Sequence, residues 1–564
     1  MNIDPITLAV IHGSLEQIAD EMDTALERMA FSPVISDGLD RASGVYKTNG
    51  ELIVQGPRGL PNFITVMAWT VGSVAERITD VRPGDLYIVN DPYLGGTHLM
   101  DVKMVMPFFY RDRFIAFLAN TGHWPDIGGR VPGGFSTQAT EIYQEGLRIP
   151  PVKLFDAGKF NRDLLDLVLS NVRVPDERYG DVVAQVASLH GGADRFTQLL
   201  DRYGEETVFA CVAELERRGE QQTREAIAGI PDGKYVFQDY IDSDGVQLEA
   251  LTLHLELEVK QDEIYFDFSG SSPPCQRPLN SVLATTIAGA HIAFRHVFPE
   301  IPINQGCFRP FHFEIPTSTF LNAQEPRPVA GCAAEVCQRV IDVVFGALGQ
   351  AIPEQTYAAP MGTVTNVAVG GHDSERGYYV LYLFIGGGYG GNYLTDGLTN
   401  GNPTIALART QAVEVMEFSY PILFTQYRIR EGSAGAGERR GGFGVIIELE
   451  LRRGEARASI LGDRGRFAPF GLLGGKPAQM ARHSFVLRGE TYWLPHVTKD
   501  ENVHMVAGDK LHLETPGGGG YGDPSKRSAE LVLQDVRREY YSREVAQREY
   551  GVEVGGDDLL IEEE

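Results

Sequence analysis

The strongest constraint on the fold is a pair of long apolar segments with one short polar break. VKMVMPFFY and FIAFLAN, between residues 102 and 120, are separated only by RDR. This pattern predicts a β-hairpin that is buried on at least one face. His98 and Asp101 come just before the first predicted strand, and His123 comes just after the second. Because antiparallel pairing brings those two ends together, we expect the three side chains to lie close to one another.

These three residues, together with Asp126, form a candidate metal site. Imidazole nitrogen and carboxylate oxygen are ligands that Zn, Mn and Fe(II) accept in catalytic sites. Paired glycines at 95–96 and 128–129 flank the candidates and let the backbone turn sharply. The same residues are equally compatible with hydrogen-bonded loop histidines and turn-capping aspartates. No HExxH or CxxC pattern is present to decide between the two interpretations.

Composition excludes several classes of partner. The chain has 564 residues, a net charge of −26 and no long basic run, which disfavours nucleic acid and anionic membrane surfaces. Five cysteines, an odd number, do not form a disulfide framework in so long a chain and fit a reducing compartment. No apolar run reaches the roughly 20 residues that span a bilayer, and the N-terminus lacks a signal-peptide pattern. We therefore expect a cytoplasmic protein.

The N-terminal part of the chain carries clear element signals. Residues 5–30 have apolar side chains at helical spacing. Asn49-Gly50, between two apolar runs, predicts a tight hairpin. Asp37 and Asp40 precede that hairpin, where either is compatible with a turn.

The rest of the chain alternates between helical and strand-rich segments. Helices are predicted within 62–80, 160–228, 281–297 and 334–352, and antiparallel strands at 85–90, within 233–268 and after 377. We therefore predict an α+β, multi-domain chain. The predicted segments are a metal-bearing mixed α/β region with an N-terminal helix (1–155), a mainly helical segment (156–230), a mixed α+β domain (231–376), a glycine- and strand-rich domain (377–524), and C-terminal helices with an acidic tail (525–564). We expect the glycine clusters in tight turns around a cleft or at subunit contacts.

No nucleotide-binding pattern is found in the sequence. GLLGGK at 471–476 resembles part of a phosphate loop, but Pro477 stands where Ser or Thr would coordinate Mg²⁺. GGGYGG and PGGGGYG lack the strand–GxGxxG–helix context of a dinucleotide site, and no GxSxG pattern occurs. We therefore expect that this chain does not bind ATP itself.

Several collinear sequence pieces carry a family signature. In chain order they are NDPYLGGTHLMD, GHWPDIGG, EIYQEGLRIPP, FDFSGSSPPCQRPLN, PINQGCFRPF, GGGYGG, EVMEFSYP, GAGERRGGFGV, TPGGGGYGDP and YGVEV. With these pieces the chain resembles the hydantoinase B family. That family includes the B component of ATP-dependent hydantoinases and lactamases, the corresponding half of 5-oxoprolinase, and the alpha subunit of acetone carboxylase. The resemblance runs nearly from one end of the chain to the other.

The resemblance implies one divalent metal ion, Zn or Mn, held by two histidines and two aspartates. The matching residues are Asp40, His98, Asp101 and His123. Asp40 is preferred to Asp37 because DRASGVYK takes the place of the family's Asp-aromatic-Ser stretch. Asn62-Phe63 and Trp124 stand where some relatives have a Val-His pair and a second histidine. These departures make the expected pocket more apolar but remove no expected ligand.

The resemblance also implies an activity, that of the metal-dependent subunit of an ATP-dependent cyclic-amide hydrolase. In such an enzyme an A-type partner subunit binds ATP and phosphorylates the carbonyl oxygen of a small-molecule substrate, and this chain hydrolyses the intermediate. The expected assembly is two A and two B chains, (AB)2. Asp126 and Glu145 are candidate catalytic bases, and Asp126 is also a candidate partner of His123 or a turn cap.

Two alternatives remain open at the level of sequence. The first is a subunit of an ATP-dependent ketone carboxylase, in which the metal stabilises an enolate. The length of 564 residues favours the hydrolase, since alpha subunits of the acetone type are longer. The second is a structural subunit with a lost site, against which the presence of all four expected ligands argues.

Overall fold

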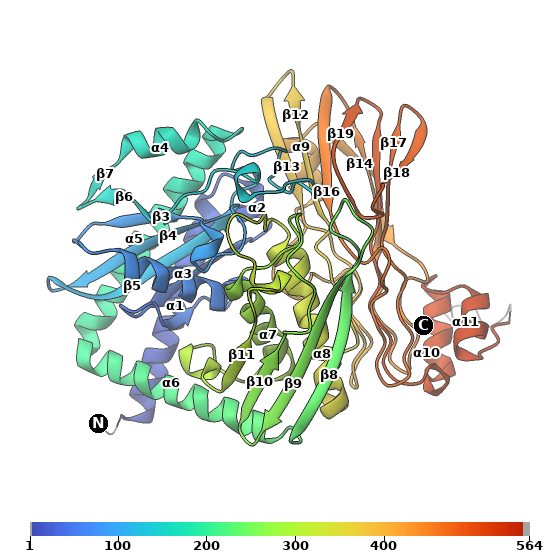
Figure 1. Ribbon diagram of the computed structural model, residues 1–564, viewed down its shortest axis with the longest axis horizontal. Helices are drawn as coiled ribbons and strands as arrows, with labels where there is room; N and C mark the ends of the chain where they lie inside the picture. Colours follow the sequence, from blue (N-terminus) through green and yellow to red (C-terminus); the bar gives the residue numbers. More distant parts are fainter. Residues whose placement is uncertain (1–2, 556–564) are drawn as a thin grey trace, which may run out of the picture.

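Four β-sheets and the helices packed around them make up the part of the chain that can be described. The computed structural model describes residues 3–555 (Figure 1). Most of the expected acidic tail, residues 556–564, lies outside the described residues. The predicted α+β, multi-domain class is confirmed. None of the helices within residues 3–555 is both long and apolar enough to cross a membrane.

The first sheet contains the predicted central hairpin. Its seven strands follow the order β2-β1-β5-β4-β3-β6-β7. Their bounds are β1 Arg41–Tyr46, β2 Leu52–Gln55, β3 Leu86–Val89, β4 Asp101–Tyr110, β5 Arg113–His123, β6 Val152–Asp156 and β7 Lys159–Phe160. Arg111 and Asp112 connect β4 to β5, and both have positive φ. Positive φ at both loop residues is what a two-residue hairpin turn of type I′ requires.

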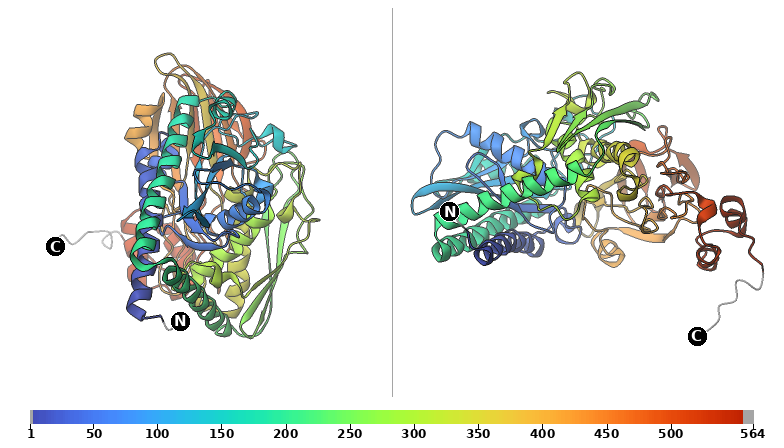
Figure 2. Two further views of the ribbon diagram at one scale, coloured as in Figure 1. Left: turned by 90° about the vertical axis from the view of Figure 1, so that its left-hand side faces the viewer. Right: turned by 90° about the horizontal axis from the view of Figure 1, so that it is seen from below.

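Helices cover both faces of this sheet. α1 (Pro5–Met29) and α5 (Pro175–Tyr203) pack against each other and against β1 and β5, while α3 (Phe63–Arg77) contacts β1, β2 and β5 from the opposite side (Figure 2). The remaining helices of this part are α2 Pro33–Ser36, α4 Arg162–Leu169 and α6 Glu205–Ala228. The helices predicted within 5–30, 62–80 and 160–228 are thus confirmed.

The second sheet and two helices form the middle of the molecule. Its strands, in the order β11-β10-β9-β8, are β8 Gly233–Ile241, β9 Leu251–Lys260, β10 Glu263–Asp267 and β11 Phe311–Glu314. The helices are α7 Leu283–Val297 and α8 Cys337–Ala351. α7 packs on α3 and on α8, and α8 packs on β8 and β9. The three helices α3, α7 and α8 therefore form one layer between the first and second sheets (Figure 1).

The C-terminal half contains two further sheets that share an apolar core. Their orders are β13-β12-β16-β19 and β14-β15-β20-β17-β18. The strands are β12 Asn366–Asp373, β13 Gly377–Leu383, β14 Ile422–Ile429, β15 Val445–Leu451, β16 Glu455–Leu461, β17 Arg482–Leu487, β18 Glu490–Trp493, β19 Lys499–Val506 and β20 Lys510–Glu514. The helices are α9 Val413–Ser419, α10 Ala529–Arg537 and α11 Arg543–Tyr550.

Short helical turns connect these elements. They are η1 Pro92–Leu94, η2 Ile142–Gln144, η3 Gln305–Phe308, η4 Phe320–Asn322, the π-helical η5 Cys332–Val336, η6 Pro353–Gln355 and η7 Pro524–Lys526. The π-helical turn leads directly into α8. Such turns are uncommon and are frequent near functional sites.

The glycine clusters do not form the tight turns expected from the sequence. They run as extended segments side by side, and their backbones hydrogen-bond between segments, as from Gly391 N to Gly519 O (2.9 Å) and from Gly518 N to Gly442 O (3.0 Å). A Cβ atom added to Gly518 would lie 1.9 Å from the carbonyl oxygen of Tyr389. The expectation of tight turns is therefore wrong, because here glycine permits close packing of backbones rather than a left-handed conformation.

Replacing a glycine inside this bundle is expected to destabilise the fold strongly. Gly518→Ala should lower the free energy of unfolding by about 3 kcal/mol or more, because the new methyl group collides with backbone atoms that have no room to move. Gly191→Ala is the matched control, since a Cβ at Gly191, in α5, meets nothing within 4 Å. This control should leave stability unchanged or raise it by up to about 1 kcal/mol. Thermal unfolding of both variants is the measurement, and equal melting temperatures would contradict the packing described here.

Candidate metal centre

The pairing of the central hairpin sets the position of the site. Asp101 is the first residue of β4, His123 is the last residue of β5, and the two are directly paired. His98 lies in the preceding loop, where its carbonyl oxygen accepts a hydrogen bond from Asp101 N (3.3 Å). Asp40 precedes β1, the other neighbour of β5, and its carbonyl oxygen accepts from His123 N (3.1 Å). The predicted meeting of the two hairpin ends is confirmed.

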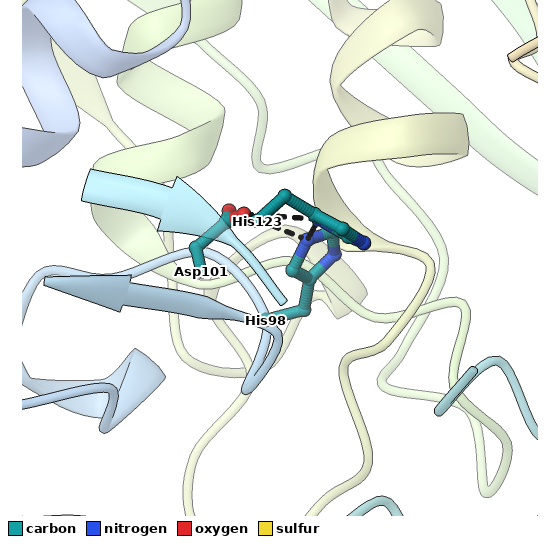
Figure 3. A group of neighbouring side chains, drawn as sticks. All are labelled: His98, Asp101 and His123. Carbon is teal, nitrogen blue, oxygen red and sulfur yellow. Dashed lines mark hydrogen bonds and ion pairs between the residues drawn. The ribbon is translucent and has the colours of Figure 1, made fainter. Parts of the chain in front are cut away.

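Three side-chain donors face a common point between them (Figure 3). His98 Nε2 lies 3.3 Å from His123 Nδ1 and 3.2 Å from Asp101 Oδ1. Asp101 Oδ1 lies 3.2 Å from His123 Nδ1. Two ligands bonded to one tetrahedral ion at about 2.1 Å are separated by about 3.4 Å. The three donors therefore already have the spacing of ligands to a single ion.

Asp40 is the fourth member of the group. Its Oδ2 lies 3.5 Å from His123 Nδ1, on the same side of the imidazole as the other donors. Asp40 is buried, whereas Asp37 is exposed. The structure thus places Asp40, and not Asp37, beside His123, at the edge of the group formed by His98, Asp101 and His123. With Asp40 included, the donor set is two nitrogens and two carboxylates, which suits Zn or Mn.

The charges of the site also fit a divalent cation. Burial alone would raise the pKa of the Asp101 carboxyl, but His98 and His123 hold that pKa well below its usual range. Burial and the neighbouring Asp101 raise the pKa of Asp40 well above its usual range. Burial lowers the pKa of His123, which keeps its imidazole neutral and able to act as a ligand. A bound divalent ion would stabilise both carboxylates as anions.

A carbonyl from a distant segment orients His98. The Nδ1 of His98 lies 3.1 Å from the carbonyl oxygen of Ala330. A proton on Nδ1 donated to that carbonyl leaves Nε2 free as a ligand, which is the usual arrangement of a metal-binding histidine. Thr97 donates a hydrogen bond from its hydroxyl to Asp101 Oδ2. Groups outside the donor set therefore hold both the His98 ring and the Asp101 carboxylate.

Glu145 supports this arrangement and lies outside the donor set. Its two carboxylate oxygens accept hydrogen bonds from Val329 N (3.1 Å) and Ala330 N (2.9 Å). Burial raises the pKa of Glu145 to about 8, even though both backbone hydrogen bonds act to lower it. Its oxygens hold the segment whose carbonyl orients His98, whereas the catalytic role of Glu145 stays a prediction.

Asp126 caps a turn, which is one of the roles expected of it. Its Oδ1 accepts hydrogen bonds from Gly128 N (2.9 Å) and Arg173 N (3.0 Å), and its Oδ2 pairs with the Arg173 guanidinium at 2.7 Å. Within residues 3–555 no hydrogen bond joins Asp126 to His123. These contacts are those of a turn-capping residue rather than of a partner of His123, and the role of Asp126 as a base stays a prediction.

Sequence reasoning missed an aromatic wall beside the histidines. The Tyr382 ring stacks on the His123 ring with centroids 5.0 Å apart, and the Phe135 ring lies 5.2 Å from Tyr382. The Tyr382 hydroxyl donates to Asn366 Oδ1 (2.6 Å), and Asn366 Nδ2 donates to Glu335 Oε1 (3.1 Å). Phe135 comes from the loop after β5, while Asn366, Tyr382 and Glu335 come from β12, β13 and the π-helical turn. No spacing pattern in the sequence connects them to the hairpin.

Comparison with known proteins identifies the family of the chain. The family model described as Hydantoinase B/oxoprolinase matches residues 4–524. The chain belongs to this family. The resemblance expected from the sequence pieces is therefore confirmed.

Members of the hydantoinase B/oxoprolinase family resemble the chain over its whole length. The caprolactamase subunit beta of Pseudomonas jessenii is 33% identical and covers 99% of this chain, which in turn covers 98% of that subunit. The crystal structure of the ATP-dependent caprolactamase from the same organism superposes with a TM-score of 0.91 at 31% identity, over 99% of this chain and 98% of that one.

Two further proteins resemble the chain more distantly. The 5-oxoprolinase 1 of Arabidopsis thaliana is 29% identical over 92% of this chain, which spans 42% of that longer protein. The nucleotide-free structure of acetone carboxylase superposes with a TM-score of 0.90, over 98% of this chain and 81% of that one. Because its identity is only 19%, this last likeness shows a shared fold alone.

The donor geometry predicts that the purified chain carries about one divalent ion, Zn or Mn. His98→Ala and His123→Ala are each expected to lose that ion, because each removes one of the converging nitrogen donors. His190→Ala, an exposed histidine on α5, is the control and should keep the ion. Elemental analysis gives the metal content, and circular dichroism shows that the variants remain folded. Full metal content in both donor variants would contradict the assignment.

Proposed function

We propose that this chain is the metal-binding, hydrolytic subunit of an ATP-dependent enzyme that opens cyclic amides. The observation that carries the proposal is the buried group of His98, Asp101 and His123, with Asp40 beside it, in a chain of this family. The relative named caprolactamase subunit beta, aligned over nearly the full length of both chains, supports a lactam or a similar ring as substrate. The neutral ring and its phosphorylated form are both small molecules of the size that protein clefts enclose.

In the proposal, ATP binding and hydrolysis are carried out by two different subunits. An unactivated amide is a poor electrophile, and phosphorylation of its carbonyl oxygen by ATP makes the carbon attackable. The sequence contains no phosphate loop, since Pro477 interrupts the nearest match. In the proposal ATP is therefore bound by an A-type partner subunit. That the similar caprolactamase chain is named a subunit supports a partner of this kind.

The residues of this chain would prepare the site for hydrolysis. His98, His123, Asp101 and Asp40 would hold the metal, which when bound polarises a substrate oxygen and lowers the pKa of water. Ala330 and Glu145 keep the His98 ring in its ligating orientation. The aromatic wall of Phe135 and Tyr382 excludes bulk water from one side of His123 and so strengthens electrostatic interactions there.

A ketone carboxylase remains the second candidate, on the ground of the fold that this chain shares with acetone carboxylase. The two candidates differ in their need for carbon dioxide. A carboxylase forms a new carbon–carbon bond from bicarbonate or CO₂, whereas a hydrolase consumes only water. The higher identity to the caprolactamase chain favours the hydrolase.

The activity is expected to depend on ATP, on the partner and on the donor set. The purified pair of subunits should open at least one member of a panel of lactams and hydantoins when ATP is supplied. His123→Ala should lower the rate about 10³-fold or more, because it removes a metal ligand beside the reacting group. His190→Ala is the control and should leave the rate unchanged. Product formation that requires bicarbonate would favour the carboxylase, and ring opening by this chain alone without ATP would overturn the proposal.

The partner is expected to contact the loop that connects β13 to α9. Its side chains include exposed apolar groups, with Leu394 exposed to 63% and Leu398 to 64%. A lasting complex of this type buries roughly 2,000 Å² or more of surface, much of it apolar. Co-expression and mass measurement should show an (AB)2 complex. Leu394→Glu with Leu398→Glu should weaken co-purification, whereas Leu167→Glu on α4 should not. A chain that remains monomeric beside its A-type partner would contradict this expectation.

A further inference from the structure

A separate cavity lies between α3, α7 and the turn that follows β2. Its volume is about 400 Å³, within the range of roughly 300–1,000 Å³ that small-molecule sites occupy. Much of its wall is apolar, and it includes Pro61, Ile64, Ile303 and Phe308. None of the four metal-donor residues lines it. The cavity is therefore a second candidate binding site in addition to the metal centre.

Two segments that line the cavity also hold the backbone around Asp40. Leu60 N, in the turn after β2, donates to the carbonyl oxygen of Arg41 (3.2 Å). Arg409 N, two residues after the cavity residue Leu407, donates to the carbonyl oxygen of Gly38 (2.8 Å). The cavity thus borders the segment that carries Asp40 into the metal centre.

Two buried side chains in the cavity wall have polar atoms without partners. His291 is only 6% exposed, and its Nδ1 lies 2.7 Å from Thr65 Oγ1, but its Nε2 has no hydrogen-bond partner. Gln55 is 4% exposed, and its Nε2 donates to Leu60 O (3.3 Å), but its Oε1 has none. Buried polar groups of folded proteins are rarely left unpaired, because each unpaired group costs free energy. Both atoms are enclosed by protein in this conformation, so a ligand in the cavity would contact them only after a side chain has rotated.

The cavity wall also contains a positive charge without a carboxylate. Arg295 donates to the carbonyl oxygens of Ile301 and Pro299, which leaves guanidinium hydrogens unused. Within residues 3–555 no carboxylate lies within 4.0 Å of Arg295, although acidic residues outnumber basic ones by 76 to 50 in this chain. The planar guanidinium group matches the geometry of a carboxylate.

We propose that this cavity binds one small organic carboxylate with an apolar body. Arg295 holds the carboxylate, and the apolar wall encloses the body. The acid released by opening a cyclic amide belongs to this class. In assigning the site to that product, the inference rests on the proposed function; the binding itself does not.

Calorimetric titration of the whole chain with hexanoate tests the site. Hexanoate should bind saturably at one site, and its neutral analogue hexanamide should bind at least about tenfold more weakly, the difference expected from loss of one charge-assisted contact. Arg295→Gln should weaken hexanoate binding by a similar factor. Arg217→Gln, an exposed arginine on α6, is the control and should leave the affinity unchanged.

Two further variants keep the test decisive. Ile303→Trp fills the cavity without touching the charge and should abolish binding even if Arg295→Gln is poorly folded. His98→Ala, which removes a metal donor, should leave hexanoate binding intact, so the result does not depend on the metal or on enzymatic activity. Affinity that survives both cavity variants, or that is lost in His98→Ala because the carboxylate binds at the metal centre, would overturn the proposal.

Discussion

The pairing of Asp101 with His123 is the contact on which the candidate site depends. Asp101 is the first residue of β4 and His123 is the last residue of β5. Their antiparallel pairing therefore brings a carboxylate next to an imidazole. A slip of one residue would turn His123 to the other face of the sheet, toward α1 and α5. The two-residue turn at Arg111 and Asp112 sets the register at the far end of the hairpin, and a β-bulge between Phe108 and Phe109 then shifts it by one residue, which gives the pairing of Asp101 with His123.

The sheet alone does not complete the site, because its other supports come from much later in the chain. The layer of α3, α7 and α8 is joined to the segment just before the π-helical turn, where the Ala330 carbonyl orients His98. β13 contributes Tyr382, whose ring covers His123. The family fold thus surrounds a short local motif with distant residues, which exclude water and fix ring orientations.

How far the site could be predicted depends on how local each interaction is. The hairpin and three of its donors follow from apolar patterning and strand pairing, which act over short distances in the chain. Asp40 was distinguished from Asp37 only by resemblance, because both suit a turn. Ala330 contributes a backbone carbonyl, which carries no sequence signal. The glycine clusters were misjudged because glycine serves sharp turns and close backbone packing equally well, and only tertiary structure separates the two.

The order of these parts along the chain has a consequence for how the protein matures during synthesis. When the ribosome has released β5, both histidines and their aspartates exist, but the carbonyl that orients His98 and the ring that covers His123 do not. The segment around Ala330 comes only after the second sheet, and Tyr382 later still. Until then the ligands remain open to any ion in the surrounding medium. If the chain binds the proposed metal, selective acquisition would therefore belong to the last stage of folding, after the β13 segment has docked.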